Sequence, residues 1–313
     1  MENALLERER MDRMLEAGTV EEAAKVLTEC GYPELQAVNV DTVDAMLAQA
    51  REELFETLND LAPDGEILDV FKVKYDYHNA KAMLKCEALG LDPERLLVDT
   101  GRVAPETLAE AVKRSEFTDL PKVMADAIVE ARAVLGKTRD PQRSDMILDQ
   151  AYFQEMEQLA KDSGSQFLLG YVRMLVDAAN LRSVVRVLRM GRDADFLATV
   201  LFPGGAIPAA TVVKAADGEP LESIYFSSLF EEAAAAGVQA IQGGSLTAFE
   251  KACDNALNAY MQKAKYIPFG EQPMLGYVSA KDNEFTAIRI ILTGRLADLP
   301  ADVIRERLRN AYV

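Results

Sequence analysis

Three carboxylates recur along the chain in the same sequence setting, and they are the residues whose chemistry first has to be explained. Asp76, Asp177 and Glu284 follow one another at intervals of 101 and 107 residues. If they met in one place, three acids could bind a divalent cation or act as general acid and base. Equivalent acids of a repeat occupy the same place in each unit, however, and therefore lie far from one another. We interpret them as structural, each paired with a group on a neighbouring helix, because a buried unpaired charge costs several kcal/mol.

Each carboxylate begins a short helical motif. At about 100° per residue, the apolar residues that follow it share its face, which is the face expected to pack inward. The basic residue at the sixth place points about 140° away, too far to pair with the acid of its own copy. The third copy differs from the others because it has Ala287 in place of asparagine. The copies are Asp76-x-x-Asn79-Ala80-Lys81, Asp177-x-x-Asn180-Leu181-Arg182 and Glu284-x-x-Ala287-Ile288-Arg289.

A second pattern follows each motif: an apolar residue, a proline near an expected helix start, and another apolar residue five places after the first. The three patterns run from Val103 to Leu108, from Ile207 to Val212 and from Leu299 to Ile304. They begin 27, 30 and 15 residues after their carboxylates. The spacing predicts three related helical units, of which the third has lost about half of its connecting segment.

No other residues form a pattern typical of a catalytic, cofactor or metal site. The single histidine, His78, has no marked nucleophile as a partner, and such a lone histidine is usually a packing or surface residue. Cys30, Cys86 and Cys253 are scattered and odd in number, which indicates a reducing compartment and no disulfide or zinc framework. The chain has neither a P-loop nor the Asp-Asp-x-x-Asp cluster typical of Mg²⁺-dependent helical enzymes. We therefore predict no catalytic, cofactor-binding or metal-binding residue.

The composition narrows the class of protein further. A net charge of −17 argues against nucleic acid and anionic lipid surfaces as partners, since both need clustered Lys and Arg. No apolar run approaches the ~20 residues that a membrane-spanning helix needs, so direct membrane insertion is not expected. The N-terminus lacks a basic region followed by an apolar stretch and does not read as a secretory signal. We expect a cytosolic chain, and its 49% hydrophobic residues suffice for a packed interior.

The elements that must position the three motifs are helical, and we predict an all-α fold. Val184-Val185-Arg186-Val187 could form a strand by propensity, but its alignment with the helical repeats favours a helix. The charged segment from Lys137 to Ser144 is the best candidate for a linker. We expect three helical bundles, over residues 1–136, 137–240 and 241–313, the third being the shortest. Helices are predicted over residues 42–60, 66–89, 105–115, 121–136, 145–161 and 166–190, on both sides of a break at 216–220, and from 245 to the end with an interruption at 266–273.

Several of these residues resemble one family, the C subunits of A/V-type ATPases, whose eukaryotic counterpart is known as the d subunit. The likeness covers most of the chain from about residue 20, and its specificity lies in the combination of pieces. The C-terminal pieces are Phe269-Gly-Glu-Gln-Pro273, Gly276-Tyr277, Lys281, Glu284, Ile288-Arg289-Ile290-Ile291 and Leu299-Pro300 to Val313. The earlier pieces are Tyr75 to Lys81, Asp177 to Arg182 and Pro203-Gly204-Gly205-x-Ile207-Pro208.

The resemblance implies a funnel of three helical bundles with pseudo-threefold symmetry. It implies a protein on the cytoplasmic end of a membrane rotor ring of proteolipid subunits, which receives the tip of the central shaft. Such a central-stalk connector transmits torque between ion transport and ATP hydrolysis or synthesis, and is itself not an enzyme. Two other classes stay open from the residues alone: a helical-repeat adaptor of another cytosolic assembly, and a Mg²⁺-dependent helical enzyme whose acids converge on one cavity.

Overall fold

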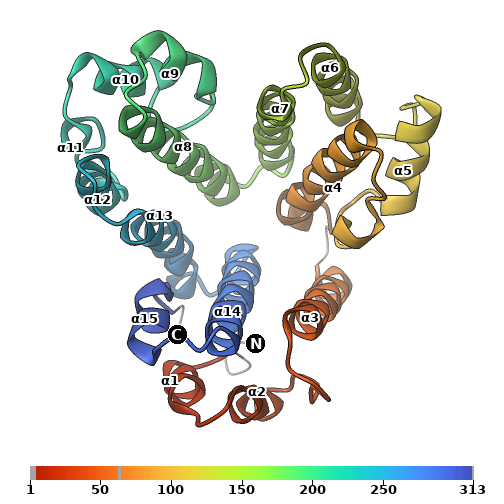
Figure 1. Ribbon diagram of the computed structural model, residues 1–313, viewed down its shortest axis with the longest axis vertical. Helices are drawn as coiled ribbons and strands as arrows, with labels where there is room; N and C mark the ends of the chain where they lie inside the picture. Colours follow the sequence, from red (N-terminus) through yellow and green to blue (C-terminus); the bar gives the residue numbers. More distant parts are fainter. Residues whose placement is uncertain (1–4, 63–64, 312–313) are drawn as a thin grey trace. The chain divides into compact units, whose positions relative to one another are not determined.

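The structure is a computed structural model that describes residues 5–62 and 65–311, and it confirms the all-α prediction. No strand occurs within these residues (Figure 1). The Val184–Val187 cluster lies inside one long helix, α8 (Gln166–Arg189), as its place in the repeat predicts. Its valines pack inward there: Val184, Val185 and Val187 are all buried. Burial of a helical face has therefore outweighed the β-propensity of the valines.

The helices are connected by short turns and by a few 3₁₀ segments. The first half of the chain contains α1 (Arg8–Glu16), α2 (Val20–Thr28), α3 (Val40–Leu61), α4 (Asp69–Leu89), α5 (Pro105–Arg114), α6 (Lys122–Thr138) and α7 (Pro141–Asp162). After α8 follow α9 (Ala194–Val200), α10 (Ala209–Val213), α11 (Leu221–Ile224), α12 (Glu231–Ile241), α13 (Leu246–Met261), α14 (Gln272–Leu296) and α15 (Ala301–Arg307).

The contacts divide the chain into two compact units. The terminal unit comprises Met1–Leu54, Asp177–Leu201 and Ile207–Val313, and the middle unit comprises Phe55–Val176 and Phe202–Ala206. Each of the two units contains at least one of the three sequence motifs. The division into bundles 1–136, 137–240 and 241–313 stays a prediction, as does the funnel with pseudo-threefold symmetry.

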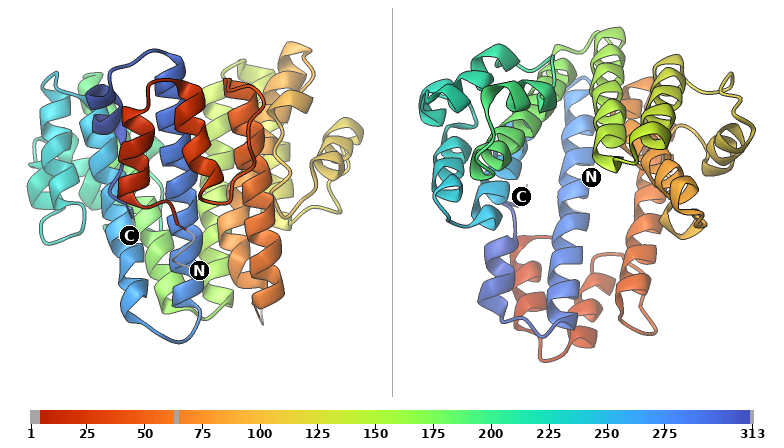
Figure 2. Two further views of the ribbon diagram at one scale, coloured as in Figure 1. Left: turned by 90° about the horizontal axis from the view of Figure 1, so that it is seen from below. Right: turned by 45° about the horizontal axis from the view of Figure 1, so that its top comes forward.

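In the terminal unit, the first helices of the chain pack against one of the last. α1 and α2 both lie against α14, and α15 contacts α1 as well as α14 (Figure 2). The interface is apolar: Met14 and Leu15 of α1 and Ile288 of α14 are fully or almost fully buried. Gly294 makes the approach of α15 possible, since a Cβ there would meet Ile304 Cγ1 at 2.7 Å.

In the middle unit, α7 packs against both α4 and α6. The segment predicted to be a linker is mostly helical, because α6 continues to Thr138 and α7 already begins at Pro141. The reason is local. Asp140 accepts a hydrogen bond from the Gln142 N–H at 3.0 Å, and Pro141 stands at the first helical position, where its missing N–H costs nothing. Within the predicted linker, Asp140 therefore caps the start of α7.

Candidate functional site: the repeated carboxylates

The three repeated carboxylates are all removed from solvent, with exposed fractions of 0% for Asp76, 2% for Asp177 and 3% for Glu284. The apolar stripe that follows each of them is also buried. It consists of Ala80, Met83 and Leu84 on α4, Leu181, Val184 and Val185 on α8, and Ile288, Ile291 and Leu292 on α14. Each motif helix thus presents a carboxylate at the start of its inward face, and the question is what satisfies that charge.

Asp76 is bound by the segment that leads into α5. Its Oδ1 accepts the backbone N–H groups of Arg102 at 2.8 Å and Val103 at 3.1 Å. Its Oδ2 accepts Nε of the Arg102 side chain at 2.8 Å. Burial raises the pKa of the Asp76 carboxyl above its ordinary value, although these donors act in the opposite direction. The carboxylate therefore fixes the entry into α5, two residues before the helix begins.

Arg102 extends this contact into a network within the middle unit. Its Nη2 donates to Glu155 Oε1 of α7 at 2.8 Å, and the Tyr77 hydroxyl donates to the other oxygen of Glu155 at 2.7 Å. Glu155 is itself buried. Sequence reasoning missed Arg102 and Glu155 because they break the repeat: the residue at the place of Arg102 in the second copy is Ala206. No repeat signal could have found them.

Asp177 makes the corresponding contact in the terminal unit. Its Oδ1 accepts the backbone N–H of Ile207 at 3.0 Å, two residues before α10 begins. Ile207 thus stands where Val103 stands in the first copy. The two sequence patterns that recur along the chain, the carboxylate and the apolar residue before a helix start, are therefore bonded to each other.

The third carboxylate, Glu284, forms this contact with a residue of the N-terminal segment. Its Oε2 accepts the backbone N–H of Leu6 at 2.6 Å, again two residues before a helix, in this case α1. Its Oε1 accepts the Tyr32 hydroxyl and, at 2.6 Å, Lys281 Nζ. Burial and the Glu284 charge both raise the pKa of the Tyr32 hydroxyl, so it stays a donor.

Leu6, and not Leu299, is therefore the third counterpart of Val103 and Ile207. An apolar residue stands five places after each of the three and is buried: Leu108, Val212 and Met11. Leu299 does precede a helix, as its proline pattern predicts, but its N–H bonds the Gly294 carbonyl at 3.0 Å. The short connection after α14 is thus complemented by the N-terminal segment.

In the first copy, the asparagine of the motif binds another residue than the carboxylate does. Asn79 donates through Nδ2 to the Val98 carbonyl at 2.8 Å and accepts the Val98 N–H at 2.9 Å, so it holds the connection between α4 and α5. Asn180 is fully buried at the same place of the second copy. Ala287, the exception, lines a small cavity of about 20 Å³ together with Leu5 and Leu6. The missing amide thus coincides with the copy whose partner segment comes from the N-terminus.

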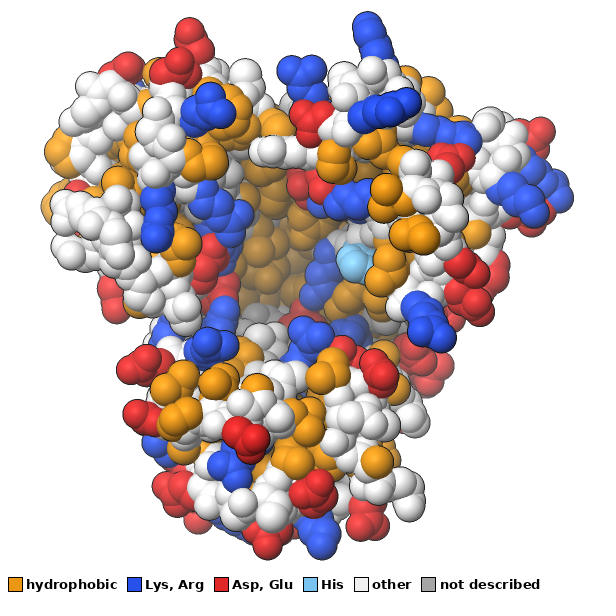
Figure 3. Space-filling model, in the orientation of Figure 1, with side chains coloured by type: hydrophobic (Ala, Val, Ile, Leu, Met, Phe, Trp, Pro, Cys, Tyr) orange, Lys and Arg blue, Asp and Glu red, His pale blue; other side chains and the backbone are white. Residues whose placement is uncertain are grey.

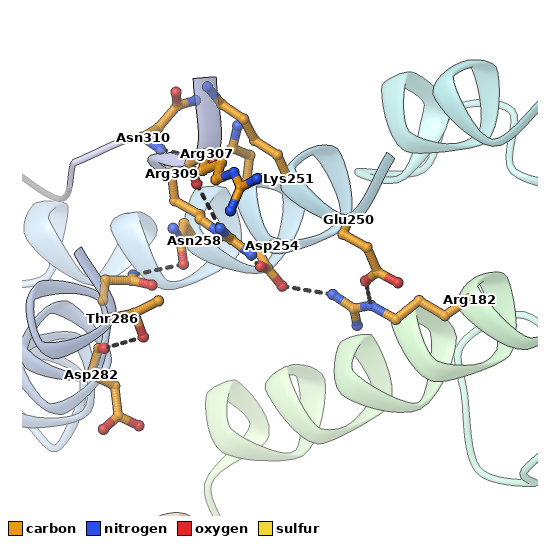
Figure 4. A network of polar contacts seen from close by, with 12 residues as sticks. Arg182, Glu250, Lys251, Asp254, Asn258, Asp282, Thr286, Arg307, Arg309 and Asn310 are labelled. Atoms are coloured by element: carbon orange, nitrogen blue, oxygen red, sulfur yellow. Dashed lines mark hydrogen bonds and ion pairs between the residues drawn. The ribbon is translucent and has the colours of Figure 1, made fainter. Parts of the chain in front are cut away.

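The basic residues of the motif pair with acids on other helices. Lys81 forms an ion pair with Asp149 of α7, and Arg289 forms a bidentate pair with Asp44 of α3 at 2.6 and 2.9 Å. Arg182 of α8 binds Glu250 and Asp254 of α13, both at 2.6 Å (Figure 4). Each basic residue therefore ties its motif helix to a second long helix, within one unit.

The single histidine and the cysteines lie apart from the repeated carboxylate contacts. His78 is exposed, and its Nε2 lies 2.9 Å from the Leu96 carbonyl. Within residues 5–62 and 65–311, no group of three His, Cys, Asp or Glu side chains is placed to hold a metal ion. Cys30, Cys86 and Cys253 are free thiols. The chemistry of the repeated site is hydrogen bonding and charge pairing that fixes helix ends.

The amino-acid sequence matches one protein family over almost the whole chain. The sequence profile of the ATP synthase (C/AC39) subunit family matches residues 1–307. The chain belongs to this family. The likeness to individual members is distant in sequence but extends over nearly their whole length.

Three relatives illustrate this. The chain is 25% identical to the C subunit of the V-type sodium ATPase of Enterococcus hirae, over 98% of this chain and 94% of the relative. It is 26% identical to the C subunit of the V-type ATP synthase of Thermus thermophilus, over 91% and 88% of the two chains. It is 23% identical to the C subunit of the A-type ATP synthase of Methanocaldococcus jannaschii, over 98% and 83%.

Proposed function

We propose that this chain is the non-catalytic connector of the central stalk in a rotary A/V-type ATPase. It links the rotor shaft to the membrane ring of proteolipid subunits and transmits the torque that couples ion transport to ATP hydrolysis or synthesis. The observation that carries the proposal is the family match over residues 1–307, together with relatives that are named as the C subunits of such ATPases.

The repeated site supports a mechanical role. A torque connector has to resist twisting, which requires close-packed helices whose ends and mutual positions are fixed. Asp76, Asp177 and Glu284 each fix the entry of a following helix, and Arg182 is one of the residues that tie a motif helix to a second helix. The three buried carboxylates therefore form contacts within the chain, and such contacts make a scaffold rigid.

The chain is proposed to act at the cytoplasmic face of the membrane, held there by protein partners and not by insertion. Among residues 5–62 and 65–311, no helix combines the length and the apolarity that crossing a bilayer requires. The face shown in Figure 3 carries acidic and basic side chains intermixed. With a net charge of −17, the chain is poorly suited to anionic lipid or nucleic acid.

The proposal is tested by removing the chain from its own cells and restoring it on a plasmid with an affinity tag. Membranes without the chain are expected to lose ATP-driven ion uptake, while the detached catalytic head still hydrolyses ATP. The restored, tagged chain is expected to co-purify with proteolipid and shaft subunits from detergent-solubilised membranes. Unchanged ion uptake in the deletion strain, or co-purification with an unrelated cytosolic assembly, would show that the chain is an adaptor of another complex.

A further inference from the structure

An open pocket in the terminal unit is lined by arginines, and none of the described residues that line it carries a carboxylate. It has a volume of ≈ 510 Å³ and lies between α14, the start of α13 and the C-terminal segment. Its three basic residues are Arg289 on α14, and Arg307 and Arg309 at and beyond the end of α15. In a chain with 51 acidic and 34 basic residues, such a concentration of guanidinium groups needs an explanation.

Two of the three arginines are held in place by acids outside the pocket lining. Arg309 donates through Nε to Asp254 Oδ2 at 2.8 Å and through Nη1 to the Arg307 carbonyl at 2.6 Å (Figure 4). Arg289 uses Nε and Nη2 on Asp44. A guanidinium has five N–H donors, so each of these two side chains retains three. Their positions are fixed while donors remain to bind a ligand.

Arg307 is different, because its side chain forms no hydrogen bond or ion pair with any residue of 5–62 and 65–311. It is exposed at the pocket, and only its backbone carbonyl is engaged, by Arg309. An exposed arginine beside two that are already oriented supplies a full charge that no residue of the described ranges neutralises.

The segment that carries Arg307 and Arg309 is held against α13 and against Gln262, the residue that follows this helix. Lys251 donates to the Glu306 carbonyl at 3.3 Å, Asn255 accepts the Asn310 N–H at 2.9 Å, and Gln262 donates to the Ala311 carbonyl at 3.1 Å. The pocket wall is therefore preorganised, which lowers the entropic cost of binding.

Comparison of the copies shows that Arg309, unlike Arg289, is not a residue of the repeated motif. Asp254 of α13 binds Arg182 in the second copy as Asp149 of α7 binds Lys81 in the first. Asp149 has no further basic partner among the contacts of the described chain, whereas Asp254 also holds Arg309. Arg309 therefore joins the ion pair that Asp254 already forms with Arg182 in the second copy, and no residue among those described takes this place in the first copy.

We propose that this pocket docks an acidic peptide segment of a partner protein, whose Asp or Glu carboxylates bind Arg307 and the free donors of Arg289 and Arg309. Planar guanidinium groups match carboxylates in paired geometry, and an open pocket of this size suits a chain segment better than a single ion. The proposal goes beyond the proposed function, because it holds for whichever assembly contains the chain.

The test uses the full-length protein and a short fluorescein-labelled peptide of alternating Glu and Gly, with a Gln-for-Glu peptide as the neutral probe. Fluorescence anisotropy at low ionic strength, where screening is weak, is expected to show binding of the acidic peptide alone. Arg307→Glu is expected to weaken it about tenfold or more, equivalent to about 1.4 kcal/mol. The matched control is Arg95→Glu, since Arg95 is also exposed; there the change should stay below about twofold.

Melting curves establish that both variants fold, as expected for exposed side chains. The proposal is overturned if the acidic peptide does not bind, or if Arg95→Glu weakens binding as much as Arg307→Glu, which would indicate a diffuse charge effect. It is also overturned if inorganic phosphate alone binds as tightly as the peptide, since the pocket would then be a small-anion site. Failure to co-purify with rotor subunits would contradict the proposed function, but it would not change the outcome of the peptide-binding test.

Discussion

The backbone N–H of Leu6 donates to the carboxylate of Glu284 at 2.6 Å, across 278 residues of sequence. The same kind of bond joins Ile207 to Asp177 and Val103 to Asp76, at separations of 30 and 27 residues. The third copy of the contact is thus completed by the beginning of the chain. The next helix start after Glu284 follows Leu299, but the carboxylate binds the residue before α1 instead.

The first prediction concerns Asp76. Asp76→Ala leaves Arg102 Nε and the backbone N–H groups of Arg102 and Val103 without this acceptor, so the free energy of unfolding should fall by about 3–5 kcal/mol. Asp76→Asn keeps an oxygen for the backbone donors, and burial already raises the pKa of this carboxyl, so the neutral side chain should cost less. Urea denaturation of the three proteins measures the difference.

Asp177→Ala is the companion variant, and the loss of the Ile207 contact should cost about 1–3 kcal/mol. If Asp76→Ala and Asp177→Ala both kept the melting temperature of the unmodified protein while assembly with partners failed, the acids would be contact residues. The structural assignment would then be wrong.

A second prediction separates the charge of Glu284 from its individual hydrogen bonds. Glu284→Ala removes the acceptor that Lys281, the Tyr32 hydroxyl and the Leu6 N–H share, so a loss of about 3–5 kcal/mol is expected. Tyr32→Phe removes one donor and leaves two, and should cost about 1 kcal/mol. Tyr266→Phe is the control: Tyr266 is 86% exposed, and its loss should stay within about 0.5 kcal/mol. Equal losses for the two tyrosine variants would contradict the role of Tyr32.

The sequence predicts most helices from α3 onward, but it indicates no helix for α1 or α2 and does not identify the long-range partners, and the reason is physical. Helical periodicity is local, so the stripe from Ala80 to Leu84 could be assigned to a buried face from its spacing alone. The bond from Leu6 to Glu284 depends on how distant segments pack, and no local pattern encodes it. The proline pattern at Leu299 correctly predicts a helix start but not the residue that binds the carboxylate.

The contact between Asp76 and Arg102 also could not be predicted in full from the sequence. Repetition reveals Asp76, because two other copies carry an acid at its place. Arg102 has alanine as its counterpart in the second copy, so its role becomes visible only when its Nε is seen 2.8 Å from the carboxylate. Repeats therefore predict the contacts that the copies share, whereas a contact present in one copy alone, such as that of Arg102, depends on how the chain folds.

The third prediction uses a glycine beside the first carboxylate. A Cβ on residue 101 would lie 2.2 Å from Asp76 Oδ1, so Gly101→Ala has to displace a side chain that is bonded by three donors. The expected destabilisation is about 1–3 kcal/mol. Gly136→Ala is the matched control: residue 136 lies inside α6, and its Cβ would meet nothing within 4 Å. There alanine should stabilise by about 0.5–1 kcal/mol, because it favours the helix.

Opposite signs for the two glycine variants in thermal unfolding would establish that space around Asp76, and not helix propensity, decides the outcome. A neutral Gly101→Ala would mean that the entry to α5 can shift without losing its hydrogen bonds, and the rigidity inferred for this contact would have to be abandoned.

The last prediction concerns alkaline pH and the thiol of Cys253, which is fully buried on α13. Burial raises the pKa of this thiol to about 12 from 9.0, although the nearby Arg182 charge acts in the opposite direction. Between these values the folded chain keeps a proton that the unfolded chain loses. Stability from this group is therefore complete below pH 9 and declines as the pH rises toward 12.

Guanidinium unfolding of the unmodified protein and of Cys253→Ala, at pH 7 and again near pH 10.5, separates this contribution from that of the tyrosines, which both proteins share. The unmodified protein should lose more stability over this interval than the variant, because only its unfolded state gains a thiolate at residue 253. A thiol reagent should correspondingly modify Cys253 of the native protein only after unfolding, and Cys30, which is partly exposed, sooner. Equal losses with pH in the two proteins, or rapid native labelling of Cys253, would show that α13 opens to solvent and does not form the rigid wall that holds Arg182 and Arg309.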